Sequence, residues 1–586
     1  MARRWLDGRR HSAWRRVGMA LALVVCGVAL ASLPASADPA PGDDALLAEQ
    51  LASGEFAPAL SRAEQAPPAQ RDARLGAIAR AQAAAGEPRA ALATAGSMRD
   101  DVLRRQTLTE SSSPPPAARG GAAGADFSSL IELITSTVAP TTWDEVGGPG
   151  AIKEYRNGVY VDALGVVHPV VDKDGGNRLN QLRQSVAHAA ADGRVRQSSP
   201  LRKISLPRLE REIQLRLAAG QPLDEEMQVL AGLQRIRYVL VYPDTGDLVL
   251  AGPAGDWTLD RENRLVGADG GRPVVQLDDL VVILRHVLNS RDGEFGCSIT
   301  PTAEGLAKAK AFLQASSGKP LKPGTRGKWL AELRGQLGRQ KVEVFGIDPR
   351  TRVAQAIVEA DYRMKLVGIG LEEGTVDVPS YLDMLKSAGK GAQSLDVLRW
   401  WFTVNYEALA TNADRNVFEL RGQGVKVLSE NELLTATGQQ VHTGQSDPLN
   451  AEFAHRFTKH FEALAKKYPV YADLQNIFDL ALTASLLRSE ALADRIGWHL
   501  LSLGDPNQYA VAHGPAPREV DTVLNHRAVN RGNRVDILAA ISGGVTVNCR
   551  SLVVPDAIVT DRQGELGSQQ QRSAPEKLQR SAWWWD

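Results

Sequence analysis

Three residues near the end of the chain are of the types that form a hydrolytic triad: Ser542, His526 and Asp536. Ser542 closes an apolar stretch that predicts a strand, and Gly543 and Gly544 follow it, so its hydroxyl would lie beside backbone N–H groups able to stabilise an oxyanion. However, the Gly-x-Ser-x-Gly turn of the α/β hydrolases is absent, and a Ser-Gly-Gly sequence is usually an ordinary turn. We therefore expect a structural turn and keep a Ser/His/Asp hydrolase site as the alternative.

The ten histidines show no spacing that predicts a metal site. His455 and His460 are five positions apart, which separates them by about 140° on a helix, whereas zinc motifs use a spacing of four. Gly368-Ile369-Gly370 lacks the third glycine and the Gly-Lys-Ser/Thr ending of phosphate-binding loops, so it predicts a strand or a tight turn. We expect neither a metal nor a cofactor.

The first 37 residues have the pattern of an export signal. Arginines dominate as far as residue 18, an apolar run covers residues 19–33, and Ala35-Ser36-Ala37 supplies the small residues read by a signal peptidase. Cleavage between Ala37 and Asp38 is expected, and the alternative is an uncleaved anchor, for which the apolar run is short. The mature chain is therefore expected to be exported, in the periplasm or at the cell surface, without a transmembrane span.

Cleavage of the signal would leave two cysteines, Cys297 and Cys549, since Cys26 lies within the signal. Disulfides persist in exported proteins, so a bridge between the two is possible. Both sit in strand-like sequences, and two thiols buried as small apolar groups are the alternative.

The charge balance also depends on the signal. The whole chain has 68 basic and 68 acidic residues, and removing residues 1–37 leaves 62 basic against 67 acidic residues. This mildly acidic balance argues against nucleic-acid binding, and 43% hydrophobic residues argue against a wholly disordered chain.

Residues 43–108 predict an all-α arm, followed by a linker over residues 111–126 that is rich in Pro and Gly. Gly54-Glu55 and Gly86-Glu87 begin two similar stretches 32 positions apart. This pair resembles tetratricopeptide (TPR) helix pairs, although an Ala-rich set of helical hairpins explains it equally well. Fewer than three repeats rarely stand alone, so the arm is expected either to pack on another element or to be mobile.

The rest of the chain predicts an α+β fold with antiparallel sheet pieces and packed helices, divided into subdomains at residues 127–290 and 291–556. Hairpins are expected at residues 159–171 and 237–251, and a three-stranded meander at residues 400–406, 417–421 and 425–428. In the first meander strand, the alternation places Trp400, Phe402 and Val404 on one face. Expected helices include residues 128–138, 206–217, 224–233, 278–288, 302–313, 327–337 and 450–503.

Charged and apolar residues alternate from Val358 to Leu366, a pattern that also overlaps a helical one. We expect Glu359, Asp361, Arg363 and Lys365 to form a solvated face in either case.

Four sequence segments resemble a family of unknown function found in secreted proteins of planctomycete bacteria. They are residues 358–372, residues 517–527, residues 542–545 and the final Trp-Trp-Trp-Asp. The resemblance would extend over about residues 150–550. It implies a lineage and an exported location, and it supplies no activity.

Residues 557–586 are polar and predict a disordered tail that ends in Trp583, Trp584 and Trp585. Three adjacent indoles are costly to leave in water, so they should dock on this molecule or on a partner. We interpret them as a partner-docking element.

These observations favour an exported, envelope-associated protein that binds or scaffolds other molecules, with proteins or cell-envelope components as partners. The alternative is a hydrolase of envelope polymers that uses Ser542, His526 and Asp536.

Overall fold

The computed structural model describes residues 43–111, 151–155, 158–162 and 193–586, the last range with short gaps at 292, 317–324, 390–396, 406–407, 436–438, 530–533, 540, 555–557, 576–577 and 580. The expected signal, the linker and the helix at residues 128–138 lie outside these residues. The described part is mixed α and β, as expected.

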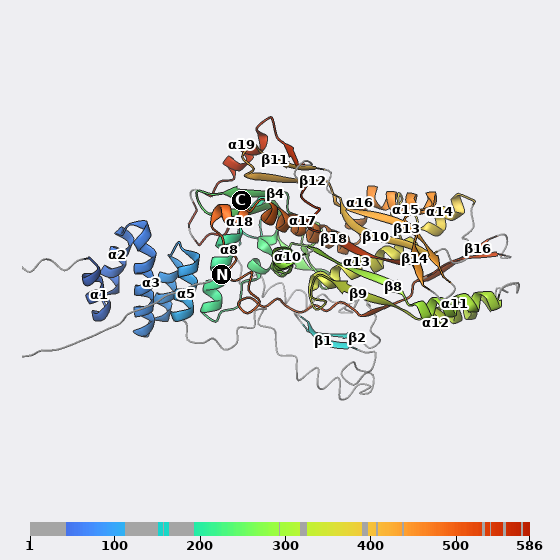
Figure 1. Ribbon diagram of the computed structural model, residues 1–586, viewed down its shortest axis with the longest axis horizontal. Helices are drawn as coiled ribbons and strands as arrows, with labels where there is room; N and C mark the ends of the chain where they lie inside the picture. Colours follow the sequence, from blue (N-terminus) through green and yellow to red (C-terminus); the bar gives the residue numbers. More distant parts are fainter. Residues whose placement is uncertain are drawn as a thin grey trace, which may run out of the picture.

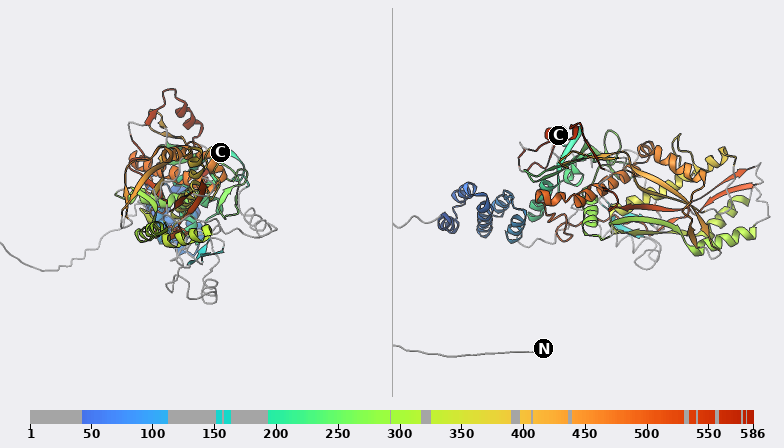
Figure 2. Two further views of the ribbon diagram at one scale, coloured as in Figure 1. Left: turned by 90° about the vertical axis from the view of Figure 1, so that its right-hand side faces the viewer. Right: turned by 45° about the horizontal axis from the view of Figure 1, so that its top comes forward.

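Five helices at the N-terminal side form an arm that extends from one end of the molecule (Figures 1 and 2). They are α1 (Asp43–Ser53), α2 (Phe56–Gln65), α3 (Pro68–Ala84), α4 (Pro88–Gly96) and α5 (Asp101–Ser111). Gly54 and Gly86 provide the positive φ angles of the turns that separate α1 from α2 and α3 from α4. The prediction of an all-α arm is confirmed.

The arm is attached to the rest of the chain through α8 (Leu206–Ala218). Leu215 packs against Gly96, where an added Cβ would lie 3.1 Å from the leucine side chain. The buried Arg104 donates to the side-chain oxygen of Gln214. The arm therefore packs on another element, which was one of the two expected outcomes.

Two seven-stranded sheets contain most of the strands described from Ser199 onward. Sheet A has the order β14 (Gln440–His442), β13 (Gly424–Leu434), β10 (Val397–Asn405), β18 (Ser542–Asn548), β8 (Glu294–Pro301), β9 (Arg339–Phe345) and β15 (Glu519–Asp521). Sheet B has the order β19 (Ile558–Thr560), β11 (Ala408–Thr411), β12 (Val417–Arg421), β4 (Tyr238–Tyr242), β5 (Asp247–Ala254), β3 (Ser199–Ser205) and β20 (Trp584–Trp585). Only β10/β18 and β11/β19 are parallel among these neighbours.

Shorter hairpins complete the strands of the described chain. They are β1 (Ala151–Tyr155) with β2 (Gly158–Asp162), β6 (Trp257–Leu259) with β7 (Leu265–Gly267), and β16 (Leu524–Val529) with β17 (Arg534–Ala539). The strand expected at residues 166–171 as the partner of β2 lies outside the described residues, and β2 pairs with β1.

The predicted meander is wrong, although its first strand is placed correctly. Trp400 and Phe402 of β10 are fully buried on one face, as the alternation indicates. β10 pairs with β13, however, whereas β12 pairs with β11 and β4 in sheet B. The additional strand β11 takes β12 as its hairpin partner and so separates it from β10.

The main core contains residues of both sheets together with residues of a set of helices that includes α10 (Leu277–Asn289), α13 (Arg352–Gly368), α15 (Pro448–Lys459), α16 (Phe461–Lys467) and α17 (Pro469–Ser489). α13 contacts β8, β18, α10 and α17, which leaves little of it in contact with water. The remaining helices with several turns are α11 (Ala303–Ser316), α12 (Arg326–Leu337) and α14 (Tyr381–Ser387), and the short ones are α9 (Glu225–Gln228), η2 (Leu230–Gly232), α18 (Leu492–Ile496) and α19 (Glu565–Arg572).

The expected solvated face over residues 358–366 is wrong for the same reason. Asp361 and Lys365 are both fully buried, and Lys365 Nζ lies 2.9 Å from Asp361 Oδ2, one helical turn away. Arg363 is also largely buried. Asp361 and Lys365 pair with each other, although burial raises the pKa of Asp361 and lowers that of Lys365. Arg363 pairs instead with Glu262 and Glu372.

The expectation of a disordered tail is wrong for the described part of residues 557–586. β19 pairs with β11, α19 contacts β12, and β20 pairs with β3. Leu566 and Trp583 are buried, so a few apolar anchors suffice to order a polar segment.

In the described part of the chain, every helix falls short of the length or the hydropathy needed to cross a membrane.

Close packing of α13 on β10 generates a first prediction. A Cβ added to Gly368 would lie 2.2 Å from the ring of Trp400, so Gly368→Ala should lower the free energy of unfolding by about 1–3 kcal/mol. Gly335→Ala in α12, where no atom lies within 4 Å, should leave the urea midpoint unchanged or raise it. Equal midpoints for the two variants would contradict this packing.

Candidate functional site

The structure does not assemble Ser542, His526 and Asp536 into the triad that was kept as the alternative to a structural turn. Ser542 is fully buried in β18 and donates its hydroxyl to Glu432 Oε2 at 2.7 Å. His526 lies in the separate β16/β17 hairpin, with Ile537 as its cross-strand partner. Burial and the positive charge of Arg326 lower the pKa of its imidazole. Asp536 stands opposite Arg527 in the same hairpin. Ser542 therefore has a carboxylate partner in place of the imidazole that a triad requires.

The possible disulfide is also not formed, because Cys297 and Cys549 are free and buried thiols. Cys297 pairs with Val545, so Cys549 lies about 13 Å further along the strand direction, beyond the reach of a bridge. Burial raises the pKa of Cys549 to about 11. The alternative of two buried thiols is the correct one.

The tryptophans at the end of the chain dock on this molecule. Trp584 and Trp585 form β20 on the edge of β3, and Trp583 enters the main core. Docking on this molecule, one of the two expected outcomes, is therefore what the structure shows, and docking on a partner stays a prediction.

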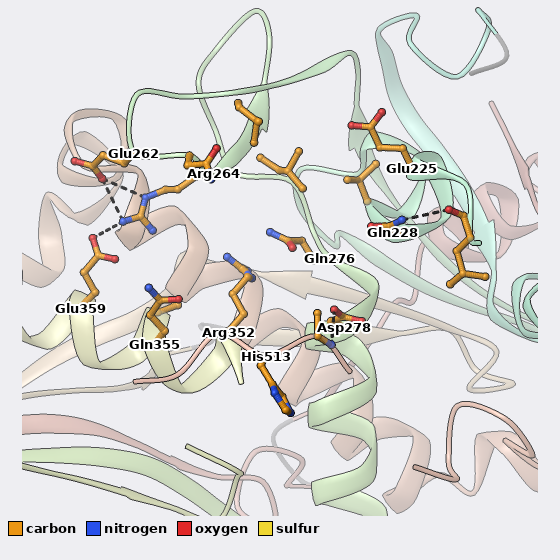
Figure 3. Close-up of a pocket in the computed structure, with 18 of the residues that line it drawn as sticks. Glu225, Gln228, Glu262, Arg264, Gln276, Asp278, Arg352, Gln355, Glu359 and His513 are labelled. Carbon is orange, nitrogen blue, oxygen red and sulfur yellow. Dashed lines mark hydrogen bonds and ion pairs between the residues drawn. The ribbon is translucent and has the colours of Figure 1, made fainter. Parts of the chain in front are cut away.

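A pocket of about 420 Å³ lies where α9, the β6/β7 hairpin, α10, α13 and residues 512–514 meet (Figure 3). We call it the acidic pocket. Its charged and amide lining consists of Glu225, Gln228, Glu262, Asn263, Arg264, Gln276, Asp278, Arg352, Gln355 and Glu359, with His513 at one side. Leu223, together with Leu259 and Leu265 of the β6/β7 hairpin, adds apolar surface. The size is typical of a small-molecule site.

Arg352 is fixed at the base of the pocket by two carboxylates from different helices. Its guanidinium donates to Asp279 of α10 and to Asp473 of α17, with Nη1 at 3.2 Å from both oxygens of Asp473. Both carboxylates are almost completely buried. Burial alone would lower the pKa of Arg352, but the two acids raise it well above its usual value.

Arg264 is held in the same way at the other side of the pocket. It contacts Glu359, lies 3.2 Å from Glu262 and reaches Asp473 at 3.4 Å (Figure 3). Burial opposes the charge, and Glu359 is the main partner that raises the pKa of Arg264. Both guanidiniums are therefore charged and already paired with acids.

The pocket consequently has an excess of negative charge. Its lining holds four carboxylates and two guanidiniums. Asp279 and Asp473 pair with the guanidiniums from behind, whereas Arg196 and Arg363 pair with the lining residues Glu225 and Glu262. With these partners the site has six carboxylates and four guanidiniums. Asp278 accepts from the hydroxyl of Tyr509 at 2.6 Å and from the N–H of Ala512, which fixes its carboxylate at the wall. Such a potential favours a positively charged ligand.

No serine, threonine, cysteine, lysine or tyrosine belongs to the described lining of the acidic pocket. The imidazole of His513 lies beyond Arg352, on the side away from Arg264 and Glu359 (Figure 3). The polar groups of the lining are thus carboxylates, guanidiniums, amides and one imidazole.

A second cavity, of about 510 Å³, lies on the face of sheet A that is opposite to Trp400 and Phe402. We call it the His442 pocket, and Ser298, Thr300, Arg399, Glu432, Gln440 and His442 supply most of its polar lining. His442 Nδ1 lies 3.1 Å from Glu432 Oε1 and 3.4 Å from Glu430 Oε2. Ser542, Glu432 and His442 thus form a chain of contacts that combines a serine, a carboxylate and a histidine. This set differs from Ser542, His526 and Asp536.

The two glutamates of this pocket differ in their pKa. Burial raises the pKa of Glu432, although the Ser542 hydroxyl opposes the shift. Burial also acts on Glu430, but the N–H of Gly444 and the guanidinium of Arg399 outweigh it and lower the pKa of Glu430.

In the described ranges, no group of three or more His, Cys, Asp and Glu side chains has the arrangement of a metal site.

The signals for both pockets were present in the sequence without indicating a site. Asp278 and Asp279 open a helix, where acids are common, and Glu262 and Arg264 belong to a polar turn. Glu359 was recognised as part of a charged run but was assigned to solvent.

Removal of the arginine at the base of the acidic pocket tests the ion pairs. Arg352→Met leaves Asp279 and Asp473 without their cation, and the free energy of unfolding should fall by about 3–5 kcal/mol. Burial already raises the pKa of Asp279, and loss of Arg352 raises it further, so protonation should make the deficit smaller at pH 5 than at pH 8. The control Arg350→Met breaks an exposed pair with Asp348 and should leave the urea midpoint unchanged. A deficit that is independent of pH would contradict this account.

Comparison with known proteins covers one part of the chain. Residues 297–381 match a family model described as "Protein of unknown function (DUF1598)". This segment includes α13, which supplies Arg352, Gln355 and Glu359 to the acidic pocket. No curated protein and no solved structure matches the chain. The resemblance to a family of unknown function is therefore supported for residues 297–381.

Proposed function

We propose that this chain is an exported, envelope-associated binding protein. The observation that carries the proposal is the acidic pocket, whose guanidiniums are already paired with acids and whose lining holds more carboxylates than guanidiniums. Pre-organised charges that neutralise one another hold a rigid surface, which lowers the entropic cost of binding a ligand.

The ligand that fits the acidic pocket is a small cation with an apolar part. Four lining carboxylates against two paired guanidiniums attract positive charge, and the leucines of the β6/β7 hairpin suit a methylene chain. Amine- and guanidinium-bearing compounds, including basic side chains of peptides, belong to this class.

The location is proposed from the first 37 residues, which have the charge and hydropathy pattern of a signal with cleavage after Ala37. An envelope protein that binds cationic groups would act on proteins or on cell-envelope components.

Substitution of Gln355 tests the ligand class. Gln355 lies one helical turn before Glu359 on α13, so Gln355→Lys places an ammonium inside the pocket and should weaken binding of agmatine by at least about tenfold. The neutral control Gln355→Met should bind agmatine like the unmodified protein. Binding is measured as a rise in Tm with agmatine, with glutarate as an anion of similar length that should cause no shift. A response to glutarate, or equal agmatine shifts in both variants, would refute a cation site.

A hydrolase is the second candidate function, and the His442 pocket is the observation that favours it. Both Glu432 Oε1 and Arg399 Nη1 lie next to His442 Nδ1, at 3.1 and 3.4 Å. In the tautomer whose Nδ1–H donates to Glu432, Nε2 would be available as a general base toward water. Ser542 would support Glu432 through its hydroxyl and would not be the nucleophile, since it is fully buried.

His442→Gln discriminates between the two functions. If the chain only binds ligands, the unmodified protein and His442→Gln should release p-nitrophenol from p-nitrophenyl acetate and from p-nitrophenyl N-acetyl-β-glucosaminide at the same background rate. A rate at least ten times that of His442→Gln would favour the hydrolase.

A further inference from the structure

The residues Trp583–Asp586, which we call the Trp segment, lie on the edge of sheet B as a bound peptide would. β20 runs antiparallel to β3, with Trp584 opposite Ile204 and Trp585 opposite Lys203. The N–H of Ser205 donates to the carbonyl of Trp583 at 2.9 Å. In the sheet order, β20 is the edge strand next to β3.

Each indole of the Trp segment has its own environment. Trp583 is 4% exposed and belongs to the main core. Trp585 packs with the separate apolar cluster that contains Leu201 and Leu566. Trp584 receives the guanidinium of Arg202 over its ring, 4.8 Å from the ring centroid.

Arg202 recognises the acid that ends the segment. Its Nε and Nη2 donate to Asp586 Oδ1 and Oδ2 at 2.9 and 3.0 Å, and the guanidinium also donates to the carbonyls of Gln197 and Ala231. Arg202 is fully buried, and among the described residues only Asp586 pairs with it as a carboxylate. A buried guanidinium is costly without a counter-ion, so this site requires an acid.

β-sheet edges recognise extended peptides through main-chain hydrogen bonds and through separate sites for successive side chains. The edge of β3 has both, and Arg202 adds a charged group that binds a carboxylate. We propose that the edge of β3 is a peptide-binding site for consecutive tryptophans followed by an acidic residue, and that it takes the Trp segment of a second copy of this chain as well as its own.

The second copy is the occupant that the chemistry selects. Release of the Trp segment exposes the N–H and C=O groups of β3 and leaves Arg202 without its carboxylate. A second copy carries the same indoles and the same acid, and therefore restores every one of these contacts. The tether through α19 gives a chain's own segment a high effective concentration, so exchange between copies requires concentrated protein.

The binding site is tested by cutting the tether after folding. A protease site is inserted between α19 and β20, and the cleaved protein is equilibrated with a fluorescent, C-terminally amidated peptide of residues 581–586. We expect the anisotropy to rise with cleaved protein and to stay low with uncleaved protein. The peptide with Asn in place of Asp586 should bind at least tenfold more weakly. Failure of the cleaved protein to incorporate the peptide, or equal binding of both peptides, would overturn the site.

Exchange between copies is tested with two differently tagged forms of the full chain. After mixing at high concentration, we expect one tag to capture the other form, and we expect this capture to be lost in Asp586→Asn and in Trp584→Ala. Trp584 is partly exposed, so its substitution should preserve the fold, which circular dichroism checks. Absence of capture, or capture that persists in both variants, would refute exchange.

Discussion

The contact on which the described fold depends is the one between Arg352 and two carboxylates that water hardly reaches. Asp279 comes from α10 and Asp473 from α17, so a single guanidinium at the start of α13 joins three helices. The Coulomb energy in such a dry environment offsets the desolvation of all three groups only because the hydrogen bonds are complete. The orientation of α13 on sheet A therefore depends on charge as well as on apolar packing.

The same helix connects the two cavities. Its N-terminal half supplies Arg352, Gln355 and Glu359 to the acidic pocket, and its C-terminal half places Asp361 and Lys365 beneath Gly543, the residue next to Ser542 at the His442 pocket. A Cβ at Gly543 would lie 2.9 Å from Asp361 Oδ1, so the glycine permits the close approach of α13 to β18. Both cavities are thus built against one largely buried helix whose charges are paired, and this helix lies in the segment that matches the family of unknown function.

Local periodicity was sufficient to predict α8, α10, α12, the β4/β5 hairpin and the buried face of β10, because each depends on neighbours within one element. Local periodicity failed where burial or strand pairing depends on residues far away in the sequence. Asp361 and Lys365 have the spacing of a surface ion pair, and only the sheet packed on α13 makes them buried. The choice of β13 instead of β12 as the neighbour of β10 is likewise nonlocal. The acidic pocket combines Glu225, Arg264, Arg352 and His513, which no short-range pattern links. The tail appeared disordered because its few apolar anchors are widely spaced.

β3 ends at Ser205 and α8 begins at Leu206, so no loop separates the strand that holds the Trp segment from the helix that holds the arm. Ser205 caps α8 through its hydroxyl and is bonded to Asp247 at 2.6 Å. A force applied to the arm therefore passes directly into β3. A pull along β3 shears the β3/β20 contact, so all of its hydrogen bonds carry the load at the same time. A pull perpendicular to β3, in the plane of the sheet, breaks these hydrogen bonds one after another. The arm and the Trp segment are therefore mechanically connected through α8 and β3.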